Sequence, residues 1–249
     1  MNETVAAIIL KQTDYREADV IISVLTKEYG KLSFVASGAR KMKSKNAGSI
    51  MPCTIADIQF DHKPGKTMFR LKTARTRNLF RALHEDLVLS AAASAACESA
   101  DVLSLAGEEE ENSDEKYELL ETCLSYLNEK KDPDLVLCGY LAEMMDLFGI
   151  LPDVDECVRC GSLKVSAFSA REGGFLCQDC ARQLDVPLRS PLDLKRLRLA
   201  VKAGLAHYDA AAATGENFHR ELRDLISVLQ LHAGIEIRAF SFYNRLFDH

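Results

Sequence analysis

Short runs of apolar and β-branched residues, separated by turn signals, fill the first 80 residues of the chain. The pairs Tyr29-Gly30 and Pro64-Gly65 are two of these turn signals, and a polar stretch separates the first two runs. Five strands are predicted, at residues 4–10, 20–25, 32–36, 55–60 and 68–73. Five short strands without a long helical pattern favour a five-stranded oligonucleotide-binding (OB) barrel, and an SH3-like barrel is the alternative.

From residue 81 onward the apolar spacing becomes helical, beginning with an alanine-rich stretch over residues 82–105. A polar break follows at residues 108–112, after which Ser113 is predicted to cap the next helix. Asp132-Pro133 and Ser190-Pro191 each combine a capping side chain with a proline in the first turn. The last helices are predicted at residues 216–232 and 235–247.

Four of the eight cysteines have the spacing C-x2-C-x16-C-x2-C, at Cys157, Cys160, Cys177 and Cys180. Each pair can place two thiolates on one tight turn, which is typical of a zinc site with two knuckles. Gly161 and Gly173-Gly174 stand where the backbone must turn. Four thiolates complete a tetrahedral shell, so we predict one structural zinc ion; a redox pair and an iron–sulfur site are the alternatives.

These patterns predict an α+β, multi-domain chain in which the OB barrel precedes an all-α helical domain with an inserted four-cysteine zinc hairpin. The predicted bounds are 1–80 for the barrel, 81–154 and 187–249 for the helical domain, and 155–186 for the insertion. The net charge of -6 conceals a partition along the chain. Residues 1–81 carry 15 Lys+Arg against 7 Asp+Glu, whereas residues 82–156 carry 3 against 20. We therefore expect a polyanion-binding surface on the first part and either a partner surface or a solvated helical face on the second.

The basic residues of the first part are densest between residues 31 and 45, where Phe34 is the single aromatic. Lysines and arginines on a loop beside a barrel can neutralise phosphates without reading bases, which predicts salt-dependent binding of general specificity. A solvated loop is the alternative. The residues predicted to contact nucleic acid are Lys31, Arg40, Lys41, Lys43, Lys45, Arg70 and Lys72.

Motifs for covalent chemistry are missing from the sequence. There is no glycine-rich phosphate loop, no His-Glu-x-x-His and no Gly-x-Ser-x-Gly, and the six histidines are dispersed. We therefore predict a protein that is not an enzyme. No signal-peptide pattern or long apolar run occurs, so we expect a soluble, unprocessed protein of a reducing cytosol, and the four scattered cysteines are expected to be buried hydrophobes.

Read in order, a basic barrel, an acidic helical part and a four-cysteine insertion resemble the RecO family of bacterial recombination mediators. The resemblance rests on AIILKQTDYREADVIISVLTKEYGKLSFVASGARKMKS near the N-terminus, on LFGILPDVDECVRCGS and on GGFLCQDC. It covers essentially the whole chain. For DNA contact it carries over to Lys31, Arg40 and Lys41, while the other DNA-binding residues rest on the charge pattern alone.

The resemblance implies a protein of the bacterial cytoplasm, associated with the nucleoid, that binds single- and double-stranded DNA and anneals complementary strands without ATP. It implies two protein partners. One is RecR, with which the protein loads RecA onto DNA coated by single-strand DNA-binding protein, and the other is the C-terminal tail of that coating protein. Two alternatives remain: an RNA-binding or transcription-associated protein with a zinc ribbon and, less favoured, a metal-dependent nuclease. We also expect that reversing the charge of Glu108 to Glu111 changes partner binding more than DNA affinity.

Overall fold

The computed structural model describes residues 2–105 and 112–247 and divides the chain into two compact units. One unit comprises Met1–Lys130 with Ile237–His249, and the other comprises Lys131–Glu236. The residues Glu108 to Glu111, on which the charge-reversal expectation rests, lie outside the described residues. Within the described ranges, no helix has the length and apolar character that crossing a membrane requires.

The first unit is built on a six-stranded sheet with the order β5-β3-β2-β1-β4-β6. Its strands are β1 (Asn2–Asp14), β2 (Val20–Thr26), β3 (Gly30–Ala36), β4 (Ile55–Asp61), β5 (Met68–Arg70) and β6 (Thr73–Asn78). All neighbouring strands are antiparallel except β3 and β5, which run parallel. A short 3-10 helix, η1 (Ala47–Ile50), leads into β4.

The fifth predicted strand divides between the two edges of the sheet. β5 pairs with β3 and β6 pairs with β4. The two residues between them continue both ladders, since the Leu71 N–H donates to the Val35 carbonyl and the Lys72 N–H to the Gln59 carbonyl, each at 3.0 Å. The sheet therefore curls until its edges meet through one bent segment, and the predicted OB-like fold is confirmed.

Alternation of apolar and polar residues directs one face of each strand into the curled sheet. In β3, Leu32, Phe34 and Ala36 are buried while the residues between them are partly exposed. Phe34 packs edge-to-face on Phe60, with ring centroids 5.1 Å apart, and Phe60 packs on Phe69 at 4.8 Å. The aromatic of the basic stretch thus belongs to the core.

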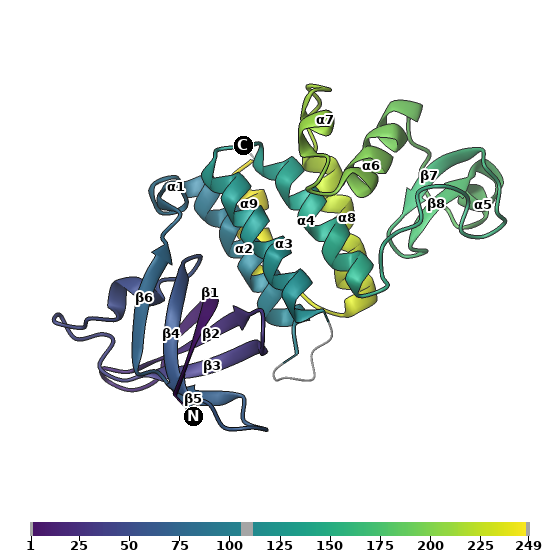
Figure 1. The fold of residues 1–249 in the computed structure, drawn as a ribbon. Helices are drawn as coiled ribbons and strands as arrows, with labels where there is room; N and C mark the ends of the chain where they lie inside the picture. Colours follow the sequence, from purple (N-terminus) through teal and green to yellow (C-terminus); the bar gives the residue numbers. More distant parts are fainter. Residues whose placement is uncertain (1, 106–111, 248–249) are drawn as a thin grey trace. The chain divides into compact units, whose positions relative to one another are not determined.

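Four helices complete the first unit: α1 (Arg81–Glu85), α2 (Leu87–Leu103), α3 (Ser113–Asn128) and α9 (Arg238–Arg245). Figure 1 shows α2, α3 and α9 beside the sheet. The predicted helix at residues 82–105 is interrupted at Asp86, whose carboxylate accepts from the Leu89 N–H at 3.0 Å and starts α2. The expectation that Ser113 caps α3 is wrong: Asn112 precedes the helix, and the Ser113 hydroxyl donates instead to the Lys27 carbonyl.

The second unit packs α4 against three other helices and carries a two-stranded hairpin beside α5 (Figure 1). Its elements are α4 (Pro133–Leu147), β7 (Val165–Ser169), β8 (Gly174–Cys177), α5 (Gln178–Gln183), α6 (Pro191–Ala203), α7 (Tyr208–Ala212) and α8 (His219–Ala233). The predicted caps of α4 and α6 are confirmed, since Asp132 accepts from the Leu135 N–H and Ser190 from the Asp193 N–H. The predicted fold class, an OB-like sheet followed by helices with a four-cysteine hairpin, is confirmed. The domain bounds stay a prediction.

Gly139 allows α4 to approach the chain closely at Gly204. A Cβ atom on Gly139 would lie 2.8 Å from both the carbonyl carbon and the carbonyl oxygen of Gly204. Both of these atoms are backbone atoms, so neither can move aside as the end of a side chain would. The absence of a side chain at residue 139 therefore sets the packing distance in the centre of this unit.

Candidate metal centre and nucleic-acid interface

The four cysteines are brought together by a turn on one side and by the end of a strand on the other. The Gly161 N–H donates to the Cys157 carbonyl at 2.8 Å, and Gly161 has a φ of 69° that favours glycine, so the first pair lies on a tight turn. Cys177 is the last residue of β8, and Cys180 lies in the helix that follows directly. The two knuckles are joined by a hydrogen bond of 3.0 Å from the Val158 N–H to the Phe175 carbonyl.

The second glycine of the hairpin has a role that its spacing did not reveal. Gly173 makes the turn, with a φ of 76°, whereas Gly174 lies in β8 beside the backbone of Asp153. A Cβ atom on Gly174 would collide with the Asp153 carbonyl oxygen and lie 2.7 Å from a methyl group of Val158. Gly174 thus lets the segment that leads into the first knuckle lie directly against β8.

The sulfur atoms fit one metal ion. All four lie within 4.8 Å of one another, and the Cys160 and Cys177 sulfurs are 3.6 Å apart. A tetrahedral zinc ion with zinc–sulfur bonds of about 2.3 Å requires sulfur separations of about 3.8 Å, which this cluster matches. All eight cysteines are free thiols, so no disulfide competes for the cluster, and the other four are buried as predicted.

The thiols of the cluster differ in how easily they ionise. Burial raises the pKa of the Cys157 thiol, but backbone N–H groups directed at its sulfur, first that of Cys177, outweigh burial and lower the pKa to about 6. The hydrogen bond with Cys177 is the largest of the effects that raise the pKa of the Cys180 thiol to about 12. A metal binds the thiolate form, so Cys157 is prepared to bind one near neutral pH.

The hairpin is also held independently of the cysteines. Arg189 donates its backbone N–H to the Ser166 carbonyl at 2.9 Å, and its guanidinium makes two hydrogen bonds to the Asp224 carboxylate of α8, one of them 2.8 Å long. The same guanidinium carbon lies 5.2 Å from the centroid of the Phe168 ring. The Arg189–Asp224 pair therefore fixes β7 to α8 whether or not a metal is bound.

A basic loop connects β3 to η1 in the first unit and contains four of the predicted DNA contacts. Lys41, Lys43 and Lys45 are exposed, and the Arg40 side chain is 47% exposed, with an ion pair of 3.1 Å to Asp14. Hydrogen bonds from the Lys41 N–H to the Gly38 carbonyl and from the Ser44 N–H to the Lys41 carbonyl fold the loop into consecutive turns. These four cations can reach an extended polyanion in solvent.

The other three predicted contacts stand in different surroundings. The Lys31 ammonium contacts both the backbone carbonyl and the carboxylate of Asp101 in α2, and its side chain is only 20% exposed. Lys72 lies between β5 and β6 and pairs with Asp61 at 2.6 Å. Arg70 is exposed at the end of β5. The structure thus places Lys31 and Lys72 in contacts within the unit.

Acidic residues of α2 and α3 cover the outer side of β2 and β3, a role that sequence analysis did not assign to them. Asp101 accepts from the Ser23 hydroxyl at 2.6 Å in addition to Lys31, and Glu118 pairs with Lys27 at 2.7 Å. Part of the charge difference between the two segments is therefore satisfied inside this unit. The opposite net charges of the two adjacent segments could have predicted these ion pairs from the sequence.

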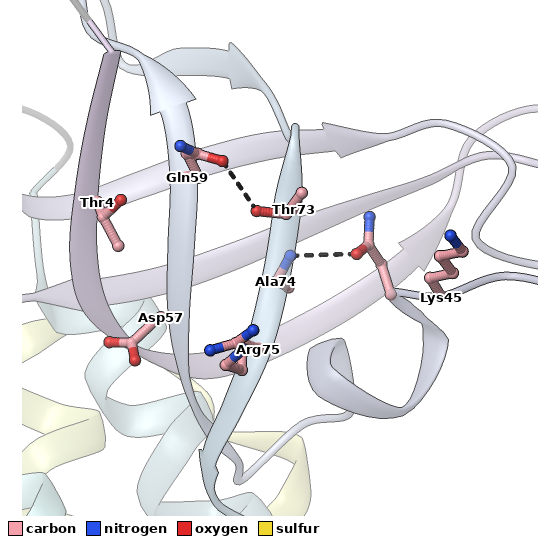
Figure 2. A pocket seen from close by; sticks show the side chains of 8 residues that line it. Thr4, Lys45, Asp57, Gln59, Thr73, Ala74 and Arg75 are labelled. Carbon is pink, nitrogen blue, oxygen red and sulfur yellow. Dashed lines mark hydrogen bonds between the residues drawn. The ribbon is translucent and has the colours of Figure 1, made fainter.

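A polar cleft of about 460 Å³ opens on the side formed by β1, β4 and β6, next to the end of the basic loop. Figure 2 shows Lys45 at its margin and Gln59, Thr73 and Arg75 along the strands. The Thr73 hydroxyl donates to the Gln59 side-chain oxygen at 3.2 Å. The cleft offers both hydrogen-bond donors and acceptors beside positive charge, so it continues the basic loop as a polar surface.

Comparison with known proteins agrees with this arrangement. A family model described as Recombination protein O N terminal matches residues 1–80, and one described as Recombination protein O C terminal matches residues 84–238. The chain belongs to the RecO family. It is 29% identical to the DNA repair protein RecO of Bacillus pumilus, over 96% of this chain and 92% of the relative, and 30% identical to that of Bacillus cytotoxicus, over 99% and 98%.

Membership of the RecO family decides between the functions left open by the sequence. The relatives are named DNA repair proteins, which favours DNA repair over RNA handling or transcription. The family models meet at residues 80 to 84, where the structure passes from β6 to α1. The RecO family relation thus spans the exposed basic loop and the four-cysteine cluster alike.

Proposed function

We propose that this RecO family chain is a recombination mediator that binds single- and double-stranded DNA and anneals complementary strands. With RecR, it promotes loading of RecA onto DNA coated by single-strand DNA-binding protein. It performs no covalent step and works in the bacterial cytoplasm at the nucleoid. The exposed cations of the loop between β3 and η1 carry this proposal, because they can neutralise phosphates on a strand without reading its bases. Two strands held in this way repel each other less and can search for pairing without ATP.

The predicted DNA contacts are expected to contribute unequally. Lys41, Lys43 and Lys45 are exposed, so phosphates can bind them without disrupting contacts within the unit that involve their side chains. Arg40 would exchange Asp14 for a phosphate, while Lys31 and Lys72 would have to leave Asp101 and Asp61. We therefore place the main phosphate contacts on the loop, with Arg70 as a further exposed contact.

The test is annealing of complementary oligonucleotides coated with single-strand DNA-binding protein, without nucleotide and at several salt concentrations. Wild type should anneal them, and Arg40→Ala/Lys41→Ala should anneal more slowly, with the deficit largest at low salt. The matched control is Arg238→Ala/Arg245→Ala, which removes the same charge from exposed positions of α9. Equal annealing rates for wild type and the loop variant would show that DNA does not bind at the basic loop. The annealing rate of Lys164→Ala/Arg171→Ala, beside the cysteines, would then be measured.

We also propose that the cysteine cluster binds one structural zinc ion. Four thiolates fill the coordination shell and leave no position for a reacting water, so the ion would hold the two knuckles together and supply no chemistry. Purified protein should contain about one zinc per chain. Metal content well below this value, with an iron–sulfur absorption band in its place, would refute the assignment.

The tail of the single-strand DNA-binding protein is the second proposed protein partner, and a groove of about 280 Å³ in the second unit is a candidate for its contact. Leu163, Phe175 and Leu194 line it with apolar surface. Lys195 adds positive charge that suits an acidic, apolar peptide, whereas the Arg198 guanidinium is paired with Asp155 of the same groove. Lys195→Glu should weaken binding of a fluorescent tail peptide, and unchanged binding would exclude this groove. Binding of RecR is measured separately with the same variant, which should bind it as wild type does.

A further inference from the structure

The face that an OB barrel often uses for oligonucleotides is covered in this chain. Such barrels bind along strands 2 and 3 and through the loops at the ends of the strands. Here Asp101 of α2 bonds to Ser23 and Lys31, and Glu118 of α3 pairs with Lys27, so the outer side of β2 and β3 faces the unit's own helices. Nucleic acid bound to the barrel must therefore use surfaces other than this face, among them the loops.

Two loops that are distant in sequence form one surface. The basic loop is hydrogen-bonded to the turn between β1 and β2: the Gly38 N–H donates to the Asp19 carboxylate at 2.8 Å, and the Arg40 N–H donates to the Ala18 carbonyl at 3.1 Å. The Arg40 side chain adds its ion pair with Asp14 at the end of β1. Three contacts thus hold the turn against the basic loop.

This turn supplies the exposed aromatic that the basic stretch lacks. Phe34 is fully buried, but Tyr15 is 48% exposed, and the Arg16 guanidinium carbon lies 5.0 Å from the centroid of its ring. The Tyr15 N–H is fixed by a hydrogen bond of 3.1 Å to the Asp19 carbonyl. The ring is therefore held in a defined turn with one face beside a cation, an arrangement that suits stacking on a flat aromatic base.

The local charge favours an exposed base over a duplex backbone. The cations Arg16 and Arg40 stand among three carboxylates, those of Asp14, Glu17 and Asp19. Asp14 and Asp19 are engaged by the basic loop, but Glu17 is exposed, so the turn itself is only weakly attractive to phosphates. The main interaction that the turn can make with nucleic acid is then stacking on the Tyr15 ring, and only an unpaired base exposes its face for stacking.

We propose that Tyr15, with Arg16 beside its ring, is a base-stacking residue that gives this surface a preference for single strands. The inference rests on the proposed function, since the basic loop must first bring a strand to the turn. Tyr15 would be a second kind of contact next to the phosphate contacts of Lys41 and Lys43. It would hold an unpaired base in place while a complementary strand approaches.

The absence of tryptophan from the chain makes a direct test possible. Tyr15→Trp introduces the chain's single tryptophan, whose emission should be quenched when a thymidine oligonucleotide binds. The emission should stay unquenched with an abasic oligonucleotide of the same length, which carries phosphates without bases. Phe242→Trp, at a 43% exposed position of α9, is the matched control and should stay unquenched with both.

Affinity measurements give a second readout. Tyr15→Ala should lower affinity for the thymidine oligonucleotide about tenfold and leave affinity for the abasic strand unchanged, while Tyr15→Phe should bind as wild type does. An equal loss on both strands, or no loss on either, would overturn the stacking role. Salt-dependent binding by wild type with an unquenched Tyr15→Trp would overturn this inference alone, whereas a wild type that binds neither strand would overturn the proposed function too.

Discussion

Lysines of one basic stretch should respond in different ways to the loss of their charge. Lys41 and Lys43 are exposed in the loop, whereas Lys31 is 20% exposed and held by Asp101. We expect Lys41→Gln/Lys43→Gln to weaken binding of single-stranded DNA without changing the free energy of unfolding. Lys31→Met should instead lower the free energy of unfolding and leave DNA binding unchanged, because the Lys31 ammonium stabilises the contact between β3 and α2.

The magnitudes follow from the number of charges that phosphates can reach. Each phosphate contact on a single strand contributes about 0.7 to the slope of log affinity against log salt, so the double variant should flatten the slope by about 1.4. Over a fourfold rise in salt, from about 50 to about 200 mM, its affinity should fall about sevenfold less than that of wild type. Lys31→Met should keep the wild-type slope and lose about 1 kcal/mol of stability.

The assay is fluorescence anisotropy of a labelled oligonucleotide at five or more salt concentrations, combined with urea denaturation of the same preparations. The reasoning is refuted if Lys31→Met flattens the slope as much as the loop variant does. It is equally refuted if Lys41→Gln/Lys43→Gln keeps the wild-type slope, since exposure would then have failed to identify the phosphate contacts.

Three further predictions concern the second unit. Gly139→Ala should destabilise it: overpacking against backbone costs about 1–3 kcal/mol and exceeds the gain in helix propensity of about 1 kcal/mol. Cys177→Ser should lower zinc content from about one per chain to near zero, whereas Cys123→Ser, which alters a buried thiol outside the cluster, should retain the metal. Burial raises the pKa of the Glu221 carboxyl, so Glu221→Gln should be at least as stable as wild type at about pH 7, with the difference shrinking toward about pH 4.

The sign of the last prediction comes from proton binding. A raised pKa means that the folded state binds the proton more tightly, so the stabilising contribution is present at low pH and is lost as the pH rises through the folded pKa. Denaturation of wild type and Glu221→Gln across this pH range measures the stability difference, and a variant less stable than wild type at about pH 7 would show that the ion pair with Arg196 outweighs burial.

For Gly139→Ala the control is Gly48→Ala, where a Cβ atom meets nothing within 4 Å, and equal stability of the two variants would contradict the packing argument.

Features that depend on residues close together in the chain were predictable from the sequence. The cysteine spacing predicted the cluster because each pair lies within one turn, and Asp132 and Ser190 predicted helix starts because a cap bonds to an N–H three residues later. The strands were found because alternation records which face is buried. The cap predicted at Ser113 was wrong because a capping residue is recognised from the sequence only by its type. The Ser113 hydroxyl instead donates to the Lys27 carbonyl, in the turn between β2 and β3.

Which basic residues remain available, and which residues lie beside them, became visible only in the folded protein. Lys31 and Lys41 look alike in sequence, but the fold pairs Lys31 with Asp101 and leaves Lys41 exposed. The turn that carries Tyr15 is bound to the basic loop because the Gly38 N–H donates to the Asp19 carboxylate and the Arg40 N–H donates to the Ala18 carbonyl. Side-chain availability depends on contacts between distant segments, and composition and spacing carry no record of those contacts.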